Sequence, residues 1–198
     1  MKSTILVLLA VSLAALSGCG KKHAVQPTGT KAPDFTLKGF DGKEVSLSDF
    51  KGKIVVLEWF SNRCPFVQYH YEKASTMIDL ANKYKDQGVV WLAIDSTSFA
   101  TDREVKDFAA KHSIPYPILD DRQGDVGRAY GAKTTPHIFV IDKQGNIVYK
   151  GAIDNAPLGE SENGLVNYVD KALAELTSGE AVSTAETRPY GCNVKYPN

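Results

Sequence analysis

Apolar residues follow two patterns along the chain, one continuous and one periodic. Residues 54–60 read Ile-Val-Val-Leu-Glu-Trp-Phe, an apolar run with one acid, which is typical of a strand buried on both faces. Residues 89–94 have the same character and predict a second buried strand. Elsewhere apolar residues recur every three or four positions, and this spacing predicts helices over 65–84, 102–112, 124–130 and 165–176.

Two hairpins complete the expected elements. Residues 34–37 and 44–47 flank Gly39-Phe40-Asp41-Gly42, and residues 137–141 and 147–150 flank a turn that ends in Gly145-Asn146. The order is strand, helix, strand, helix, then a hairpin and a last helix. This order predicts an α/β three-layer sandwich with a mixed central sheet, extended at its N-terminus by the first hairpin.

The first residues are typical of a secretory signal. Lys2 precedes an apolar run over 5–16, which is too short to span a bilayer. The run ends in Leu16-Ser17-Gly18-Cys19, which resembles the bacterial lipobox, in which the cysteine is lipidated and becomes the mature N-terminus. The alternative is a signal that is cleaved without lipidation, leaving Cys19 without a role.

These features predict the domain organisation and the location of the protein. We expect a lipoprotein signal peptide over 1–18, a flexible tether over 19–32, a domain over 33–177 and a C-terminal tail over 178–198. The protein would then be exported and held by acyl chains on the periplasmic side of a bacterial envelope. By analogy with lipoproteins, Gly20 after the cysteine favours the outer membrane.

Composition excludes several function classes. Lys and Arg together number 23, as do Asp and Glu, so the formal net charge of zero argues against a nucleic-acid partner. Three cysteines are too few for a disulfide scaffold and too scattered for a zinc site. The sequence has neither the Gly-rich loop of a nucleotide cradle nor the Ser and His spacing of a hydrolase, and we expect no cofactor and no metal.

Cys64 is the candidate for chemistry. It stands four residues after the first buried strand and directly before Pro65 and a predicted helix. The N–H groups and the dipole of a helix N-terminus stabilise a thiolate, which is the nucleophilic form of cysteine. Arg63 would add positive charge beside it. The alternative is a buried and inert cysteine.

The residues around Cys64 resemble the thioredoxin superfamily. Residues 55–64 resemble the strand that leads to the redox cysteine of thioredoxin, with Cys64 on the nucleophilic position and Glu58 on the buried acid beneath the site. Residues 134–142 resemble the segment with the cis-proline, which would make Thr135, Pro136 and Pro65 substrate-binding residues. Within the superfamily the chain resembles the redoxin group, the alkyl hydroperoxide reductase and thiol-specific antioxidant family.

The chain also departs from each subfamily. Val67 occupies the position of the second cysteine of thioredoxin, so the usual vicinal disulfide cannot form. Ser61-Asn62-Arg63-Cys64-Pro65 matches the peroxidatic core of peroxiredoxins, in which Ser61 would hydrogen-bond the thiolate or the peroxide. However, Leu57 stands where peroxiredoxins have a proline, and Pro136 stands near the position of their arginine.

The remaining thiol supplies a hypothesis for turnover. The tail is long enough for Cys192 to reach Cys64, and we expect Cys192 to resolve a sulfenic acid or mixed disulfide formed there. Cys192 could otherwise be free or structural. Glu58 is expected to carry a raised pKa and to transfer protons to the departing thiol, the alternative being an acid paired with a nearby lysine.

The expected activity is therefore that of a thiol oxidoreductase. Its substrate would be a hydroperoxide or a thiol or disulfide of a protein, and its electron donor is not indicated by the sequence. One alternative is a non-catalytic binding module that has kept the fold. A metal-handling relative is a further alternative, although Gln68 replaces the second cysteine that copper-delivery proteins of this fold use.

Overall fold

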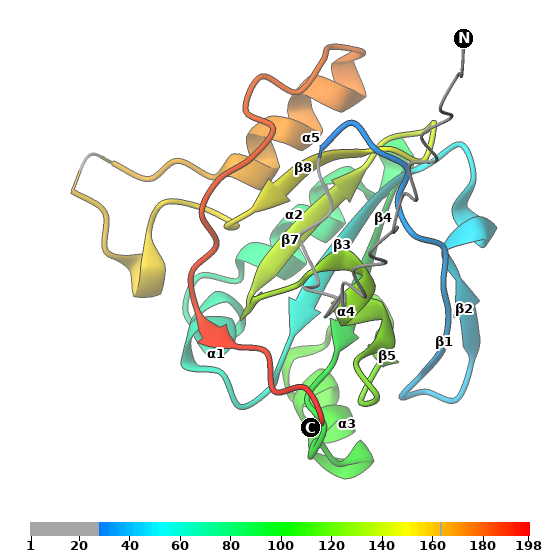
Figure 1. The fold of residues 1–198 in the computed structure, drawn as a ribbon. Helices are drawn as coiled ribbons and strands as arrows, with labels where there is room; N and C mark the ends of the chain where they lie inside the picture. Colours follow the sequence, from blue (N-terminus) through cyan, green and yellow to red (C-terminus); the bar gives the residue numbers. More distant parts are fainter. Residues whose placement is uncertain (1–27, 163) are drawn as a thin grey trace, which may run out of the picture.

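A seven-stranded mixed sheet forms the centre of the protein (Figure 1). The computed structural model describes residues 28–162 and 164–198. The strand order is β2-β1-β5-β4-β3-β7-β8, with a separate two-stranded pair, β6-β9. The strands are β1 (Thr36–Gly39), β2 (Glu44–Ser46), β3 (Ile54–Phe60), β4 (Val89–Asp95), β5 (Ile118–Asp120), β6 (Thr134–Thr135), β7 (His137–Ile141), β8 (Ile147–Gly151) and β9 (Cys192–Asn193). This architecture is the thioredoxin-like α/β sandwich with the N-terminal hairpin that the sequence predicts.

Strand β3 lies in the interior of the sheet, and every residue of it is buried. It pairs in parallel with β4 and antiparallel with β7, so its backbone groups are used on both sides. A strand that is covered on both faces needs apolar side chains at nearly every position, which explains the continuous run in the sequence. Glu58 is the exception within the strand.

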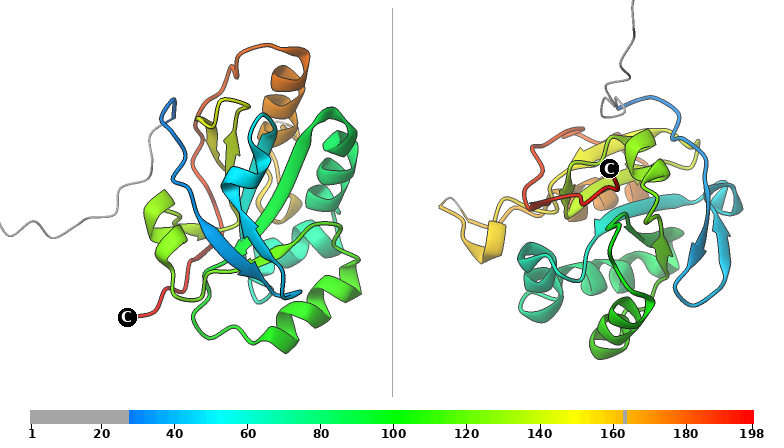
Figure 2. Two further views of the ribbon diagram at one scale, coloured as in Figure 1. Left: turned by 90° about the vertical axis from the view of Figure 1, so that its right-hand side faces the viewer. Right: turned by 60° about the horizontal axis from the view of Figure 1, so that its bottom comes forward.

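Helices cover the sheet on both faces (Figures 1 and 2). The helices are α1 (Pro65–Glu72), α2 (Thr76–Tyr84), α3 (Asp102–His112), α4 (Asp125–Tyr130) and α5 (Tyr168–Ser178), with 3-10 turns η1 (Leu47–Phe50), η2 (Lys85–Gln87) and η3 (Pro157–Gly159). Buried side chains of α1, α2, α3 and α5 pack with Val56 and Phe60 on one face of β3. Those of α4 pack with Leu57 and Trp59 on the other face.

The structure differs from the expected elements at three places. The predicted helix over 65–84 is two helices, because the chain turns at Ser75, whose φ of 51° is left-handed. Strand β5 was not expected, since three residues are too few to show a period. The last helix begins at Tyr168, because the side chain of Asn167 caps it by accepting a hydrogen bond from the Asp170 backbone N–H.

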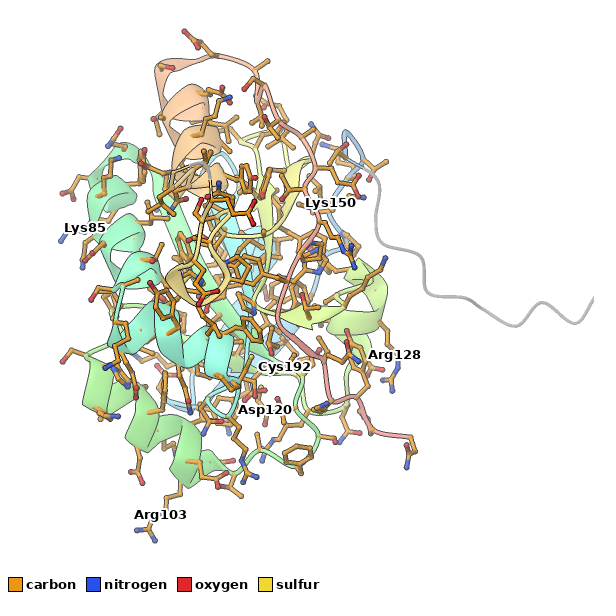
Figure 3. The ribbon with its side chains drawn as sticks, turned by 90° about the vertical axis from the view of Figure 1, so that its left-hand side faces the viewer. Lys85, Arg103, Asp120, Arg128, Lys150 and Cys192 are labelled. Carbon is orange, nitrogen blue, oxygen red and sulfur yellow. The ribbon has the colours of Figure 1, made fainter. Side chains whose placement is uncertain are left out.

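The C-terminal tail lies against the domain along its whole course. After α5 it runs beside β8, where Lys150 and Glu186 form a parallel bridge, and continues past the start of α1 (Figure 1). Strand β9 then pairs with β6, and the last residues reach α4. In Figure 3 the segment passes from the region of Lys150, by Cys192, towards Arg128. The tail is thus part of the folded domain.

Candidate active site

Cys64 is the N-cap residue of α1, and its side chain is only 2% exposed. Pro65 at the first helical position has no N–H to leave unpaired there, which suits it to begin the helix. The Cys64 thiol points to the neighbouring segment and donates a hydrogen bond to the Thr135 carbonyl oxygen at 2.8 Å. Cys64 therefore faces β6.

The Thr135–Pro136 peptide bond is cis, as the resemblance implies. The two residues of β6 just before it pair antiparallel with β9, with Thr134 opposite Asn193 and Thr135 opposite Cys192. The chain at Gly191 comes so close that an added Cβ would lie 2.1 Å from the Thr135 carbonyl oxygen. The tail therefore needs glycine at this position, and it delivers Cys192 to the residue that Cys64 contacts.

Cys64 and Cys192 are both free thiols in this structure. Partial burial raises the pKa of Cys192, and a hydrogen bond with the Cys64 thiol raises it further. Cys192 therefore keeps its proton at neutral pH. The arrangement places one thiol at a helix N-terminus and a second, protonated thiol beside it, from a segment at the far end of the sequence.

A buried polar cluster fixes the tail just before Gly191. The Tyr190 hydroxyl donates to Asp154 Oδ1 at 2.5 Å and lies 2.8 Å from His70 Nε2. Since its one hydrogen goes to the carboxylate, the hydroxyl accepts from Nε2–H, and His70 Nδ1 accepts from the Thr76 hydroxyl at 3.1 Å. Burial lowers the pKa of His70, which agrees with a neutral ring. Every member of the cluster is thus paired.

Two further tail residues, Thr187 and Tyr196, hold the tail on either side of Cys192. Upstream, the Thr187 hydroxyl lies 2.6 Å from the Tyr149 hydroxyl and accepts from the Ala152 N–H at 3.0 Å. Downstream, the Tyr196 hydroxyl donates to the Ala132 carbonyl at 2.9 Å, and the Arg128 guanidinium lies 4.9 Å from its ring centre. Cys192 is therefore positioned from both directions.

Glu58 is completely buried on β3, on the face that packs against α1. Burial raises its pKa to about 7, although hydrogen bonds from Trp91 and Tyr71 partly counteract this effect. The Trp91 indole N–H donates to Oε2 at 3.0 Å. None of these hydrogen-bond partners is a lysine, so none of them neutralises the charge of the carboxylate. A carboxyl group with this pKa can both take and give a proton at neutral pH.

The other predicted residues lie near Cys64 with different partners. Ser61 is buried, and its Oγ accepts a hydrogen bond from the Thr97 hydroxyl at 3.1 Å. Among the described residues its hydroxyl is thus paired with Thr97 and not with the Cys64 thiol. Val67 is fully buried in the core. Arg63 is directed to the surface, where Glu104 holds its guanidinium at 2.5 Å, so its charge is already compensated.

Several site residues were missed by sequence reasoning. His70 and Tyr71 are both buried, His70 in the tail cluster and Tyr71 against Glu58. Asp154 and Tyr190 gave no signal, because no local pattern links residues 36 positions apart. The spacing of Val67, His70 and Tyr71 on one face of α1 could have indicated that this face is buried.

Comparison with known proteins agrees with the geometry. Residues 28–150 match the model of the AhpC/TSA family. The chain is 32% identical over 139 residues to the thiol-disulfide oxidoreductase ResA of Bacillus cereus (strain ATCC 10987 / NRS 248), covering 70% of this chain and 78% of that protein.

Solved structures show the same likeness. The hypothetical protein SMc02350 from Sinorhizobium meliloti 1021 superposes with a TM-score of 0.76 and 30% identity, covering 88% of this chain and 97% of that one. A putative thiol:disulfide interchange protein DsbE from Chlorobium tepidum gives a TM-score of 0.57 and 28% identity over 64% of this chain and 85% of that one. Because residues 28–150 of the 198 match the family model, this chain belongs to the AhpC/TSA family.

Proposed function

We propose that the protein is a thiol oxidoreductase in which Cys64 is the nucleophile and Cys192 is the resolving cysteine. The observation that carries the proposal is the β6–β9 pair, which puts Cys192 opposite Thr135 while the Cys64 thiol donates to the Thr135 carbonyl. Val67 stands at the position of the vicinal cysteine, and the tail provides Cys192 as the partner thiol in its place. The likeness to ResA and to the DsbE structure supports the same chemistry.

The proposed reaction has two steps and transfers two electrons to the oxidant. The Cys64 thiolate attacks a hydroperoxide, the O–O bond breaks, and Cys64 becomes a sulfenic acid while an alcohol leaves; with a disulfide, a mixed disulfide forms and one thiol leaves. Cys192 then attacks Cys64 Sγ and releases water or the second thiol. Either route ends in a Cys64–Cys192 disulfide, and two electrons have passed to the oxidant. An external dithiol reduces the disulfide again.

Other residues prepare the site for these steps. Pro65 begins the helix whose N-terminus stabilises the thiolate, and the Thr135–Pro136 segment orients both thiols. Glu58 would exchange protons with the site during thiol release, because its pKa of about 7 suits this role. Ser61 would support the loop through its carbonyl oxygen, which accepts from the Cys64 N–H at 3.1 Å.

A binding module without catalysis is the second candidate. Val67 favours it, because the chain lacks the usual vicinal pair. The tail weighs against it, since β9 already occupies the Thr135 edge where an extended partner would pair. The paired thiols are better explained by redox chemistry.

Mass spectrometry tests the proposal directly. After treatment with one equivalent of hydrogen peroxide or of a small disulfide, the wild-type protein should contain a Cys64–Cys192 disulfide. Cys192→Ser should instead accumulate a sulfenic acid or mixed disulfide on Cys64, and Cys64→Ser should not react. A Cys64 thiol that reacts no faster than free cysteine would favour the binding module.

The proposal includes a lipid anchor at Cys19. The lipobox-like residues 16–19 and the preceding apolar run support an exported lipoprotein, but they lie outside the described residues. Within the described residues no helix is long and apolar enough to cross a bilayer. Fatty-acid labelling in a bacterial host should mark the wild-type protein and not Cys19→Ser. Labelling of both proteins, or of neither, would contradict the anchor.

A further inference from the structure

The docked tail occupies the position in which an extended polypeptide would bind. The backbone of Thr134 and Thr135, next to the cis-proline, is an edge to which a strand can pair, and β9 pairs with it. The pairing continues beyond β9, because the Val194 N–H donates to the Lys133 carbonyl at 3.0 Å. No second strand can use this edge while the tail is in place.

The tail is built to stay there. Tyr190 is held by Asp154 and His70, and Tyr196 is held by Ala132 and Arg128, so anchors lie on both sides of Cys192. The Tyr190 ring also lies 6.0 Å from the ring of Phe66 on α1. These contacts come from α1, α4 and the segment after β8, and removing the strand would break all of them.

Beside the tail there is space for a small molecule. An open hollow of about 600 Å³ is lined by Gly191 and Asn193, the two neighbours of Cys192, although neither Cys64 nor Cys192 itself lines it. Its other side is formed by Thr134, Asp154 and Tyr168. This volume is in the range of small-ligand sites.

Resting on the proposed function, we infer that the tail is a specificity element that restricts Cys64 to small oxidants and excludes extended polypeptide disulfides. The substrate class is a small molecule with a reducible O–O or S–S bond. Such a molecule needs to reach only the sulfur, whereas a polypeptide needs the Thr135 edge as well. The tail therefore supplies Cys192 and selects the substrate through the same strand.

A matched pair of disulfides tests this inference in single turnover. Both carry a cysteine joined to 2-mercaptoethanol; in one the cysteine is N-acetylcysteine amide, and in the other it is the centre of an eleven-residue unstructured peptide. Cys192→Ser is used so that the adduct on Cys64 persists: the thiolate attacks the S–S bond, a mixed disulfide forms, and one thiol leaves. The small disulfide should consume the Cys64 thiol at least tenfold faster.

Releasing the tail should remove this preference. Gly191→Ala in the Cys192→Ser background puts a methyl group 2.1 Å from the Thr135 carbonyl, so the strand cannot approach. Gly179→Ala is the matched control, because its φ of 85° is also left-handed and its Cβ would meet nothing within 4 Å. Tyr190→Ala is a second way to release the tail. Amide exchange at Val194 reports release, and thermal melting confirms that each variant is folded.

In a variant that exposes Val194, the rate ratio should fall towards one, while Gly179→Ala keeps the original ratio. Equal rates for the two disulfides with Val194 still protected would overturn the inference and leave the proposed function intact. A peptide that stays tenfold slower after Val194 becomes exposed would also overturn it. Absence of any reaction at Cys64 beyond that of free cysteine would instead overturn the proposed function.

Discussion

The Tyr71 hydroxyl lies 3.0 and 2.9 Å from the two carboxylate oxygens of Glu58, so a residue of the active-site helix holds the buried acid of the central strand. The Tyr116 hydroxyl lies 2.8 Å from that of Tyr71, and Tyr116 as a whole is a partly exposed residue. Because the Tyr71 hydrogen goes to the carboxyl group, Tyr116 donates to Tyr71. Two hydroxyl groups in series thus connect Glu58 to Tyr116.

Glu58→Gln should change how stability depends on pH. The pKa of Glu58 rises from 4.5 in the unfolded chain to about 7 in the folded one, so the folded state binds the proton more tightly. The resulting stabilisation is present below pH 4.5 and is lost as the pH rises to about 7, a loss of about 3 kcal/mol. The free energy of unfolding of Glu58→Gln minus that of the wild type, measured with urea, should therefore increase by about 3 kcal/mol between pH 4.5 and pH 8.

Glu44→Gln is the control for this measurement, because Glu44 is an exposed carboxylate on β2. Its free energy of unfolding should follow the wild-type curve. If Glu58→Gln also ran parallel to the wild type at all pH values, the carboxyl group would not titrate differently in the folded and unfolded states.

Tyr71→Phe should raise the pKa of Glu58 above about 7. Burial is the larger influence and raises this pKa, while the hydroxyl of Tyr71 lowers it by stabilising the carboxylate. Nuclear magnetic resonance of the glutamate side-chain carbon would follow the titration. A lower pKa in the variant would show that water replaces the hydroxyl and solvates the carboxylate.

Tyr190→Phe should destabilise the folded protein while keeping the aromatic packing. The change leaves the Asp154 carboxylate and the His70 ring without their shared partner in a buried place, which costs about 1–3 kcal/mol. Urea unfolding measures the loss. Tyr168→Phe, at the start of α5, serves as the comparison, and an equal effect of both variants would contradict a special role for the Tyr190 hydroxyl.

Arg63→Ala should have little effect on the reactivity of Cys64. The guanidinium is exposed, lies 5.2 Å from the Phe99 ring centre and is paired with Glu104, so the thiol gains little from its charge. The rate of Cys64 alkylation by iodoacetamide should change by less than about twofold. A tenfold loss of rate would show that the arginine acts on the thiolate despite its carboxylate partner.

Sequence reasoning predicted the parts of the fold that depend on local patterns. The apolar run of β3 and the period of α3 gave these elements with their bounds, and Cys64 was placed at a helix N-terminus because the helix follows a buried strand. The buried environment of Glu58 followed from its place in an apolar run. These features lie within a few residues of the signals that predict them.

The rest depends on contacts between distant segments. The sequence showed that Cys192 could reach Cys64, but it did not show the β6–β9 pair, because two residues have no measurable period. The tail cluster of Tyr190, Asp154 and His70 joins three segments whose polar residues look like ordinary surface residues. No local pattern indicates the hydrogen bonds that Tyr71 and Trp91 donate to Glu58 either.

The distance along the chain between Cys64 and Cys192 has a thermodynamic consequence. A vicinal pair closes a ring of a few residues and barely restricts the unfolded chain, whereas this pair encloses all of the elements from α1 to the start of β9. A cross-link over roughly 130 residues lowers the conformational entropy of the unfolded state enough to add about 5 kcal/mol to stability. Each catalytic cycle would therefore switch the protein between a looser dithiol form and a form whose unfolding is strongly suppressed.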